Sequence, residues 1–513
     1  MKSTAKSSHK TLHNRLSLAR RPLVRGTLVL TVTGLITRVI GFFYRIYLSR
    51  LFGEEGMGIY QLLSPVLSLS FSLCAAAYQT AISKFVAEYT GHSRRRFLPL
   101  YSGILLSLPL SLLCCALLYS YADFIAIRML LEPRTAPMLR ILSFSIPFSS
   151  MHACINGYFY GVKQTAPPAV AQLIEQLTRV GCVYLTTAHV LSLGKTPSIN
   201  VAVFGLAVGE VVSMCVCLLA IFHAYRTDSA AQDTVYAISL SDNTLPASNN
   251  FSSSRLRRSY SVKPTVPHSI SRNSADLGSN GHTQTPSRPT GFPQPRELLL
   301  LPILRMALPL TLNRIVLNLL QSIESVSIPA RLRLYGYDNV TALSVYGVLT
   351  GMAMPMIFFP NALTNSVSVL LLPLISENAA RGDMKAVRSA VLRTVKFCAI
   401  MGITFLSFFF LTGHLIGETL FDSPLAGHFI TTLSFLCPFL YLDATLSSIL
   451  QGLGKAGTSF FINVLAHLIR LGFVFLAIPL VGITGYLWGI LASQIILSLL
   501  YLLCLRRFLK QNR

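Results

Sequence analysis

The sequence Gly34-Leu-Ile-Thr-Arg38-Val-Ile-Gly41-Phe-Phe-Tyr-Arg45 places two arginines inside an apolar stretch that is long enough to cross a bilayer. A charged side chain at the bilayer centre costs roughly 2.5–3.5 kcal/mol, so such a side chain usually faces a wet cavity or a partner. Arg179, Arg314 and Arg470 lie equally deep in later apolar stretches. These positions predict a membrane helix bundle that encloses a cationic cavity suited to an anion.

The composition places the chain among polytopic helical membrane proteins. Of its 513 residues, 52% are hydrophobic and 12% are charged, whereas soluble domains carry about 25% charged residues. Apolar stretches of about 20 residues follow one another along the chain, which predicts an all-α membrane protein. We expect twelve transmembrane helices, at residues 24–49, 57–79, 98–121, 137–160, 168–191, 200–225, 299–323, 342–372, 390–412, 428–450, 456–479 and 482–505.

The formal net charge of +24 is concentrated in clusters. Basic runs are typical of nucleic-acid binding, but twelve spans would put all the main clusters on one side of the membrane. The positive-inside rule then predicts a multi-pass plasma-membrane protein with both termini in the cytoplasm and no nucleic-acid partner. The clusters are at residues 2–25, 94–96, 226–296 and 506–513.

A Ser-, Asn-, Thr- and Pro-rich segment at residues 226–298 divides six spans from six and predicts a disordered cytoplasmic linker. Gly161, Arg179 and Gly181 recur at the same spacing as Gly452, Arg470 and Gly472, which favours an internal duplication. The expected regions are a basic cytoplasmic tail (1–23), a six-helix lobe (24–225), the linker (226–298), a second lobe (299–505) and a basic tail (506–513).

Two polar stripes are the candidate substrate-binding residues. Arg38 and Arg45 share a helical face with Gly34 and Gly41, and the second stripe has the same type of spacing. We expect both stripes to line a chamber between the two lobes. The alternative for Arg45 and Glu324 is that they only extend to the membrane interface. The second stripe consists of Arg314, Asn318, Gln321 and Ser325.

Other charged residues are candidates for ion pairs or coupling. Glu175 and Arg179 are spaced for an ion pair within one helix, and either neutralise each other or contact substrate. Glu210 either takes up a proton or cation or pairs with a buried arginine. Asp443 and Arg470 are the candidate equivalents in the second lobe.

Prolines interrupt the eighth predicted span. Pro355 and Pro360 each remove a backbone donor there, so this span is either a hinge or a plain kink.

The sequence carries no recognisable catalytic or cofactor motif. The letters GxGxxG at residues 452–457 lie in a short loop between two spans with no preceding strand, so we interpret them as a turn. The ten cysteines all fall in predicted spans without metal-ligand company. We therefore expect no cofactor, no metal and no enzymatic activity. A membrane enzyme acting on a lipid-linked sugar would usually need large loops with catalytic residues.

Several stretches resemble the stage V sporulation protein B family. They are the run Gly34 to Arg50 continuing to Glu55-Gly56-Met-Gly58-Ile-Tyr60-Gln61, then Tyr158-Phe-Tyr-Gly161 and Gln172-Leu-Ile-Glu175-Gln-Leu-Thr-Arg179. The second half agrees through Leu320-Gln321-Ser-Ile-Glu324, Tyr346-Gly-Val-Leu-Thr-Gly351 and Gln451-Gly-Leu-Gly454-Lys455. Together these stretches cover about residues 24–225 and 298–505.

This resemblance implies membership of an exporter superfamily that also contains multidrug extruders and the lipid II flippase MurJ. The implied architecture is two six-helix lobes that form a V and work by alternating access. The implied cargo is a polyprenyl-pyrophosphate-linked saccharide, such as a lipid II-like peptidoglycan precursor. By similarity of position, Arg38 would bind the pyrophosphate, as first-helix arginines do in MurJ.

We therefore expect a flippase that works as a monomer, with the lipid-linked saccharide, membrane lipids and cell-wall synthesis proteins as its partners. Two alternatives stay open. A cation-coupled multidrug exporter of the same fold would use Glu175 and Glu210, and a scaffold for cell-wall synthesis would not transport at all.

Overall fold

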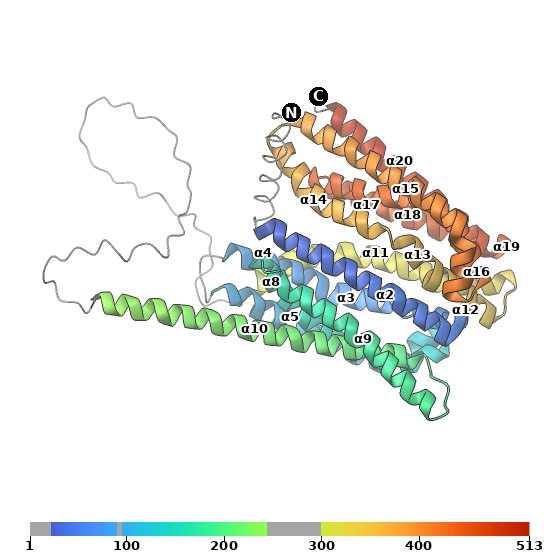
Figure 1. Ribbon diagram of the computed structural model, residues 1–513, viewed down its shortest axis with the longest axis horizontal. Coiled ribbons are helices and arrows are strands. Elements are labelled where there is room, and N and C mark those ends of the chain that lie inside the picture. The colour runs from blue at the N-terminus through green and yellow to red at the C-terminus, as the bar shows by residue number, and fades with distance from the viewer. Residues whose placement is uncertain (1–21, 90–94, 244–298, 512–513) are drawn as a thin grey trace, which may run out of the picture. The chain divides into compact units, whose positions relative to one another are not determined.

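The computed structural model describes residues 22–89, 95–243 and 299–511, and every regular element in these ranges is a helix (Figure 1). The predicted all-α class is thus confirmed. Most of the predicted N-terminal tail and residues 244–298 of the predicted linker lie outside the described residues. Among the described residues, those up to His223 and from Leu299 form one compact unit, to which residues 224–243 at the end of the sixth long helix do not belong.

The helices of the first half follow the order expected for six spans. The longest is α10, which continues as a helix to Asn243, past the predicted start of the linker at residue 226. The elements are α2 (Pro22–Gln61), α3 (Ser64–Phe71), η1 (Ser72–Ala76), α4 (Ala77–Glu88), η2 (Arg95–Phe97), α5 (Leu98–Ser120), α6 (Ala122–Phe124), η3 (Ile125–Met129), η4 (Pro133–Thr135), α7 (Ala136–Ser143), α8 (Ser145–Gly161), α9 (Ala166–Ser192) and α10 (Asn200–Asn243).

The second half begins at α11 and repeats this order of long helices. Its elements are α11 (Leu300–Tyr335), α12 (Asn339–Gly347), η5 (Val348–Ala353), α13 (Met354–Phe358), α14 (Asn361–Ala380), α15 (Met384–Phe421), α16 (Pro424–Leu433), η6 (Ser434–Leu436), α17 (Cys437–Gly452), α18 (Ala456–Leu476), α19 (Ile478–Val481) and α20 (Ile483–Gln511).

Ten helices in the described residues are long and apolar enough to cross a membrane. An eleventh span results if α7 and α8, which meet at a bend of 43°, are counted together. The fifth predicted span, 168–191, lies on α9, which is not among these ten or eleven. Its polar face, which includes Gln172, Glu175 and Arg179, explains its lower hydropathy. The count of twelve is therefore not reproduced by length and composition.

Local chemistry explains where several helices bend or begin. Gly53 has a φ of 67°, which glycine adopts without strain, and it breaks α2 before its last turns. The Asp338 carboxylate accepts a hydrogen bond from the Val340 amide at 3.2 Å and caps α12. Asp383 and Ser423 cap α15 and α16 in the same way, at 3.0 and 3.1 Å. Each cap satisfies an amide that the first turn would otherwise leave unpaired.

The core runs through both halves of the compact unit. In the first half α2 packs against α9, and in the second half α11 packs against α18. Between the halves, α2 packs against α12 and η5, and α11 packs against α3 and α4. One buried apolar cluster therefore contains residues from both halves, including Leu48 and Tyr346.

Candidate functional site

A cavity of about 590 Å³ lies between the two halves of the bundle. First-half residues from α2 and α3 line one side, and second-half residues from α11 to α20 line the other. The lining residues are Arg38, Gly41, Phe42, Arg45, Gln61 and Ser64 from the first half, and Gln321, Glu324, Ser325, Ile328, Tyr346, Thr350, Met354, Pro355, Phe358, Phe359, Asn361, His467, Arg470 and Tyr486 from the second.

Arg38 and Arg45 project into this cavity from one face of α2. Gly41 lies between them at helical spacing and also lines the cavity, and a Cβ added there would contact the Gln176 amide of α9 at 3.4 Å. Arg38 is exposed and Arg45 is half-buried. Among the described residues neither arginine has an ion pair, so both guanidinium groups are available to a ligand.

Glu324 on the opposite wall is buried and fully engaged. Its Oε1 accepts a hydrogen bond from the Tyr486 hydroxyl at 2.7 Å and lies 3.5 Å from Arg470 Nε. Its Oε2 lies 3.2 Å from His467 Nδ1, which in turn is 2.9 Å from Arg470 Nη2. This cluster neutralises the carboxylate inside the wall and leaves it little capacity to bind a cationic ligand.

The charge of the cavity wall is positive. Its arginines (Arg38, Arg45 and Arg470) outnumber its one carboxylate (Glu324) by two. In a low-dielectric membrane interior such unpaired charge is costly unless an anion or water compensates it. The cavity wall therefore carries positive charge that the protein does not itself neutralise.

Three of the predicted substrate-binding residues are not among those that line the cavity. Asn318 donates hydrogen bonds to the Ser68 carbonyl, at 3.3 Å, and to Ser72, and so ties α11 to the first half. Arg314 is exposed and shares a helical face with Gln321, two turns nearer the start of α11. Arg179 pairs with Glu175 at 2.7 Å on α9.

A second polar cluster lies within the first half. His152 Nδ1 is 3.3 Å from Glu210 Oε2, so a histidine lies beside the Glu210 carboxylate. Ligand atoms of His152, Glu175 and Glu210 lie within 4.8 Å of one another, and among the described residues this group could hold a cation. The Arg179 guanidinium already supplies positive charge to Glu175.

Asp443 and Arg470 occupy different environments. Asp443 is buried and accepts a hydrogen bond from Ser498 at 2.5 Å, whereas Arg470 lies with Glu324 in the cavity wall. The two side chains therefore have different partners, and their role as the second-lobe equivalents of the charged residues in the first lobe stays a prediction.

The two prolines lie at a break in the helix that borders the cavity. Pro355 is in the first turn of α13 and lines the cavity. Pro360 stands between the end of α13 and the start of α14 at Asn361. Thr364 donates a hydrogen bond to Asn361 Oδ1 at 2.6 Å and stabilises the new start. The break itself is present, and its use as a hinge stays a prediction.

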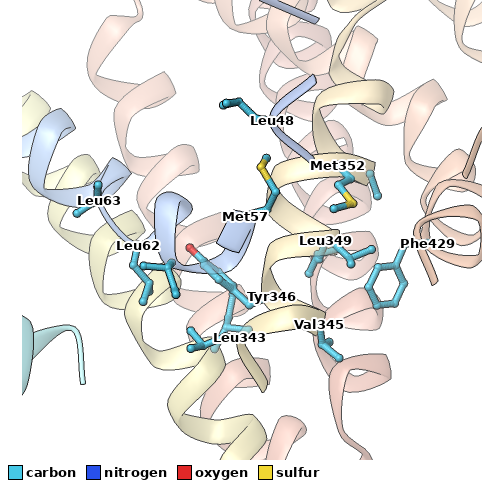
Figure 2. Close-up of a cluster of buried hydrophobic side chains, with 14 of the residues drawn as sticks. Leu48, Met57, Leu62, Leu63, Leu343, Val345, Tyr346, Leu349, Met352 and Phe429 are labelled. Atoms are coloured by element: carbon cyan, nitrogen blue, oxygen red, sulfur yellow. The ribbon is translucent and has the colours of Figure 1, made fainter. Parts of the chain in front are cut away.

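The two halves meet closely just beyond the cavity, where α2 crosses α12. A Cβ added to Gly58 would overlap the Leu343 carbonyl, and one added to Gly347 would overlap the Gly58 backbone. Figure 2 shows the apolar side chains that surround this crossing, including Leu48 and Met57 on α2, Tyr346 on α12 and Phe429 on α16. We call the Gly58–Gly347 crossing, together with the apolar side chains that surround it, the closure.

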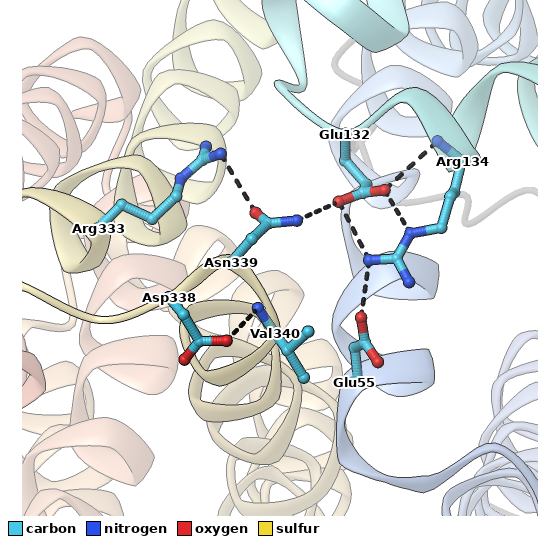
Figure 3. Close-up of polar contacts among 7 residues, drawn as sticks. All are labelled: Glu55, Glu132, Arg134, Arg333, Asp338, Asn339 and Val340. Carbon is cyan, nitrogen blue, oxygen red and sulfur yellow. Dashed lines mark hydrogen bonds and ion pairs between the residues drawn. The ribbon is translucent and has the colours of Figure 1, made fainter.

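A polar network extends the closure to the connecting segments (Figure 3). Glu132, which is buried, accepts hydrogen bonds from Arg134 Nε at 2.6 Å and from Asn339 Nδ2 at 3.0 Å. Arg134 also forms an ion pair with Glu55 at 2.7 Å, and Arg333 donates to Asn339 Oδ1 at 3.2 Å. The Glu132–Asn339 bond connects the first half to the second.

Two further bonds join the halves at the same place. Arg50 Nε donates to the Leu420 carbonyl at 2.9 Å, which attaches α2 to the end of α15. The Ser423 hydroxyl, which caps α16, donates to Glu54. The cavity is thus closed at this end by backbone contact, apolar packing and cross-half hydrogen bonds.

Several residues that complete the site could not be recognised from the sequence. Gln61, Tyr346, His467 and Tyr486 line the cavity, but each reads as an ordinary polar or aromatic residue in a span. His467 could have been found from its spacing, because it lies one helical turn before Arg470 and so on the same helix face.

Comparison with known proteins agrees with this architecture. The sequence profile of the family described as Polysaccharide biosynthesis protein matches residues 23–257, and that of MatE matches residues 311–476. Stage V sporulation protein B of Bacillus subtilis (strain 168) is 24% identical over 489 residues, which cover 94% of this chain and 83% of the relative.

A flippase and a transporter are also similar to this chain. The lipid II flippase MurJ of Bacillus subtilis (strain 168) is 26% identical over 204 residues, 36% of this chain and 37% of the relative. A MurJ structure in an inward closed conformation superposes with a TM-score of 0.62 at 14% identity, over 93% of this chain and 87% of that chain. An inward-facing multidrug resistance MATE family transporter of the MOP superfamily gives 0.63 at 15% identity, over 95% and 98%.

These structural likenesses identify the fold, and the sequence matches span both halves of the chain. The chain is therefore similar over nearly its whole length to stage V sporulation protein B, its first half matches the polysaccharide biosynthesis profile, and it is a multi-pass membrane protein with the all-α fold that MATE transporters and MurJ share.

Proposed function

We propose that this protein is a flippase that moves an anionic polyprenyl-pyrophosphate-linked saccharide from the cytoplasmic to the outer leaflet of the cell membrane. The observation that carries the proposal is the cavity between the halves, where Arg38 and Arg45 have no ion-pair partner among the described residues. The cargo is a lipid II-like peptidoglycan precursor or a related polysaccharide unit. The protein works as a monomer with both termini in the cytoplasm.

Guanidinium groups suit a pyrophosphate. Each presents a planar fork of donors that matches two phosphate oxygens, and the resulting charge-assisted bonds are stronger than neutral ones. Arg38 and Arg45 lie two turns apart on one face of α2, so they can contact neighbouring phosphates of one ligand. Gln61 and Gln321, which also line the cavity, offer amides to the sugar hydroxyls.

The names of the relatives support this substrate class. The similar protein MurJ is a lipid II flippase, and the profile that matches the first half describes polysaccharide biosynthesis. Arg314, on the face of Gln321, would receive the headgroup before it reaches Arg38.

Alternating access requires the closure to open. In the proposed cycle the cavity first admits the headgroup from the cytoplasmic side, while the Gly58–Gly347 crossing seals the outer side. Separation of the halves there would break the Glu132–Asn339 bond and the Arg50 bonds to α15. The break at Pro360 would let α14 move relative to α12. The saccharide headgroup then leaves to the outside.

The runner-up is a cation-coupled multidrug exporter of the same fold, which the first-half cluster of His152, Glu175 and Glu210 favours. A cationic drug, however, would meet two unpaired arginines in the cavity between the halves. We propose that the first-half cluster serves coupling in a flippase. A scaffold for cell-wall synthesis would need no accessible cavity arginines.

The test is binding of undecaprenyl pyrophosphate-linked saccharide, compared with the neutral undecaprenol, to purified protein. We expect Arg38→Ala and Arg45→Ala each to weaken binding about 10- to 100-fold, because hydrogen bonds to charged groups contribute about 1.5–3 kcal/mol. Arg128→Ala is the matched control, since Arg128 is an exposed arginine away from the cavity lining. Equal binding of both lipids, or equal losses in all three variants, would refute the proposal.

A further inference from the structure

The start of α15 carries a stripe of cations that the proposed transport cycle does not use. Lys385, Arg388, Arg393 and Lys396 are all exposed, and together with Ser389 and Leu392 they enclose a surface hollow of about 300 Å³. The spacing of three, five and three residues places the four cations around one helical face. We call these four residues the α15 stripe.

The helix presents this face outward because its opposite face is anchored. Val387 and Val391 are buried in an apolar cluster with Tyr501 and Leu505 of α20. Arg393 donates from Nε and Nη2 to the Ser389 hydroxyl at 3.2 and 2.7 Å, which holds its guanidinium over the hollow. The stripe is therefore a positioned surface on a packed helix.

The nearby carboxylates are already engaged. Asp383 caps the first turn of α15, and Glu377 pairs with Arg381 at 2.6 Å. Among the described residues the four stripe cations have no ion pair. Their charge is thus available to a partner that carries phosphate.

The position of the stripe along α15 matches the level of lipid headgroups. The run from Phe397 to Gly417 carries no Asp, Glu, Lys or Arg and is about 31 Å long at 1.5 Å per residue, close to the ~30 Å hydrocarbon core of a bilayer. Lys396 therefore lies at the boundary of the core, and Arg393, Arg388 and Lys385 extend from it into the headgroup layer.

The same face continues as an apolar surface. Ile400, Ile403 and Leu411 follow the stripe at helical spacing and are 66%, 60% and 80% exposed. A molecule with an anionic head and hydrocarbon tails would match this sequence of cations followed by apolar side chains. Basic clusters next to a membrane helix typically bind anionic lipid headgroups.

We propose that the α15 stripe is a binding site for an anionic phospholipid of the surrounding bilayer. The phosphodiester binds Arg388 and Arg393, Lys385 and Lys396 flank it, and the acyl chains lie along Ile400, Ile403 and Leu411. The site is separate from the transport cavity, because the two sets of lining residues share no member. This proposal does not depend on the identity of the transported cargo.

The experiment uses full-length protein in a neutral detergent, titrated with phosphatidylglycerol or phosphatidylcholine, with bound lipids counted by native mass spectrometry. We expect wild type to prefer phosphatidylglycerol by roughly tenfold. The preference should disappear in the quadruple variant Lys385→Gln, Arg388→Gln, Arg393→Gln and Lys396→Gln. Inorganic phosphate at the same concentration should compete weakly, because it lacks the acyl chains.

The matched control removes Arg506, Arg507 and Lys510, three exposed cations at the end of α20, by substitution with Gln. This variant should keep the preference. An equal loss in the α20 variant would overturn the proposal, since it would show a general effect of basic charge. Unchanged preference in the quadruple variant, with normal thermal unfolding, would also overturn it. So would a selective loss of polyprenyl pyrophosphate binding, which would make the stripe a cargo site.

Discussion

Asn339 on α12 donates a hydrogen bond to Glu132 at 3.0 Å and so joins the two halves of the chain at the closure. The acceptor is buried, and Arg333 holds the Asn339 amide from the other side at 3.2 Å. Because the acceptor is a carboxylate, this bond is stronger than a neutral one. The opening of the closure must break it.

We expect Asn339→Ala to loosen the closure. Loss of a hydrogen bond to a charged group costs about 1.5–3 kcal/mol, so amide hydrogen exchange in residues 54–61 and 339–347 should rise roughly tenfold. Asp338→Asn is the control, because Asn also caps α12 and Asp338 has no bond to the part of the first half that the structure describes. Equal exchange in wild type and Asn339→Ala would show that the bond does not hold the halves together.

The Gly58–Gly347 crossing should tolerate no side chain. Gly347→Ala places a methyl group against the Gly58 backbone, and overpacking of this kind costs about 1–3 kcal/mol. We expect a lower thermal midpoint and faster amide exchange at the closure. Gly181→Ala is the matched control, because no atom lies near its added Cβ. Similar behaviour of the two variants would contradict a tight crossing.

The pH dependence of the free energy of unfolding should show how much the ionised Glu132 carboxylate contributes to stability. Burial alone would raise the pKa of Glu132, but hydrogen bonds from Arg134 and Asn339 lower it below the ordinary value of 4.5. The ionised Glu132 carboxylate therefore stabilises the fold fully above pH 4.5. This stabilisation is lost as the pH falls through the lowered pKa. The stability difference between wild type and Glu132→Gln should therefore be constant above pH 4.5 and shrink below it.

Thermal unfolding at several pH values measures this difference. Glu88→Gln is the control, since Glu88 is exposed and lies 3.9 Å from Lys84. The Glu88 variant should differ little from wild type throughout. A Glu132→Gln deficit that stayed constant below pH 4.5 would show that the carboxylate charge is not what Asn339 and Arg134 recognise.

The Glu324–Arg470 pair should behave as a coupled unit. Arg470→Ala leaves the buried Glu324 carboxylate with His467 and Tyr486 as its partners among the described residues and should destabilise the fold by about 3 kcal/mol. Adding Glu324→Gln removes that charge and should recover most of the loss. A double-mutant cycle of thermal unfolding measures the coupling. Additive effects would mean that the two groups do not interact.

The sequence predicted the membrane helices well because the cost of exposing polar groups to lipid acts on each residue separately. Apolar runs therefore mark the spans wherever they occur, and Arg38 and Arg45 could be placed on one cavity-facing helix face by spacing alone. The fold class and family resemblance are confirmed on that basis.

The partners across the bundle could not be predicted in the same way. Glu324 meets Arg470 and Tyr486 only because α11, α18 and α20 pack together. Nothing in the local spacing of Asn339 indicates Glu132, which precedes it by 207 positions. The closure also depends on two glycines whose importance arises from the crossing of their helices.

Arg38 and Arg45 are part of α2, and Arg470 is part of α18, so these charges stay with the protein. In the proposed flippase, each pyrophosphate headgroup therefore carries its own negative charge through the electric field of the membrane. With the inside negative, each elementary charge moved outward gains about 2.3 kcal/mol per 100 mV. The membrane voltage then drives outward crossing and opposes return, and every flipping event contributes to a measurable electrical current.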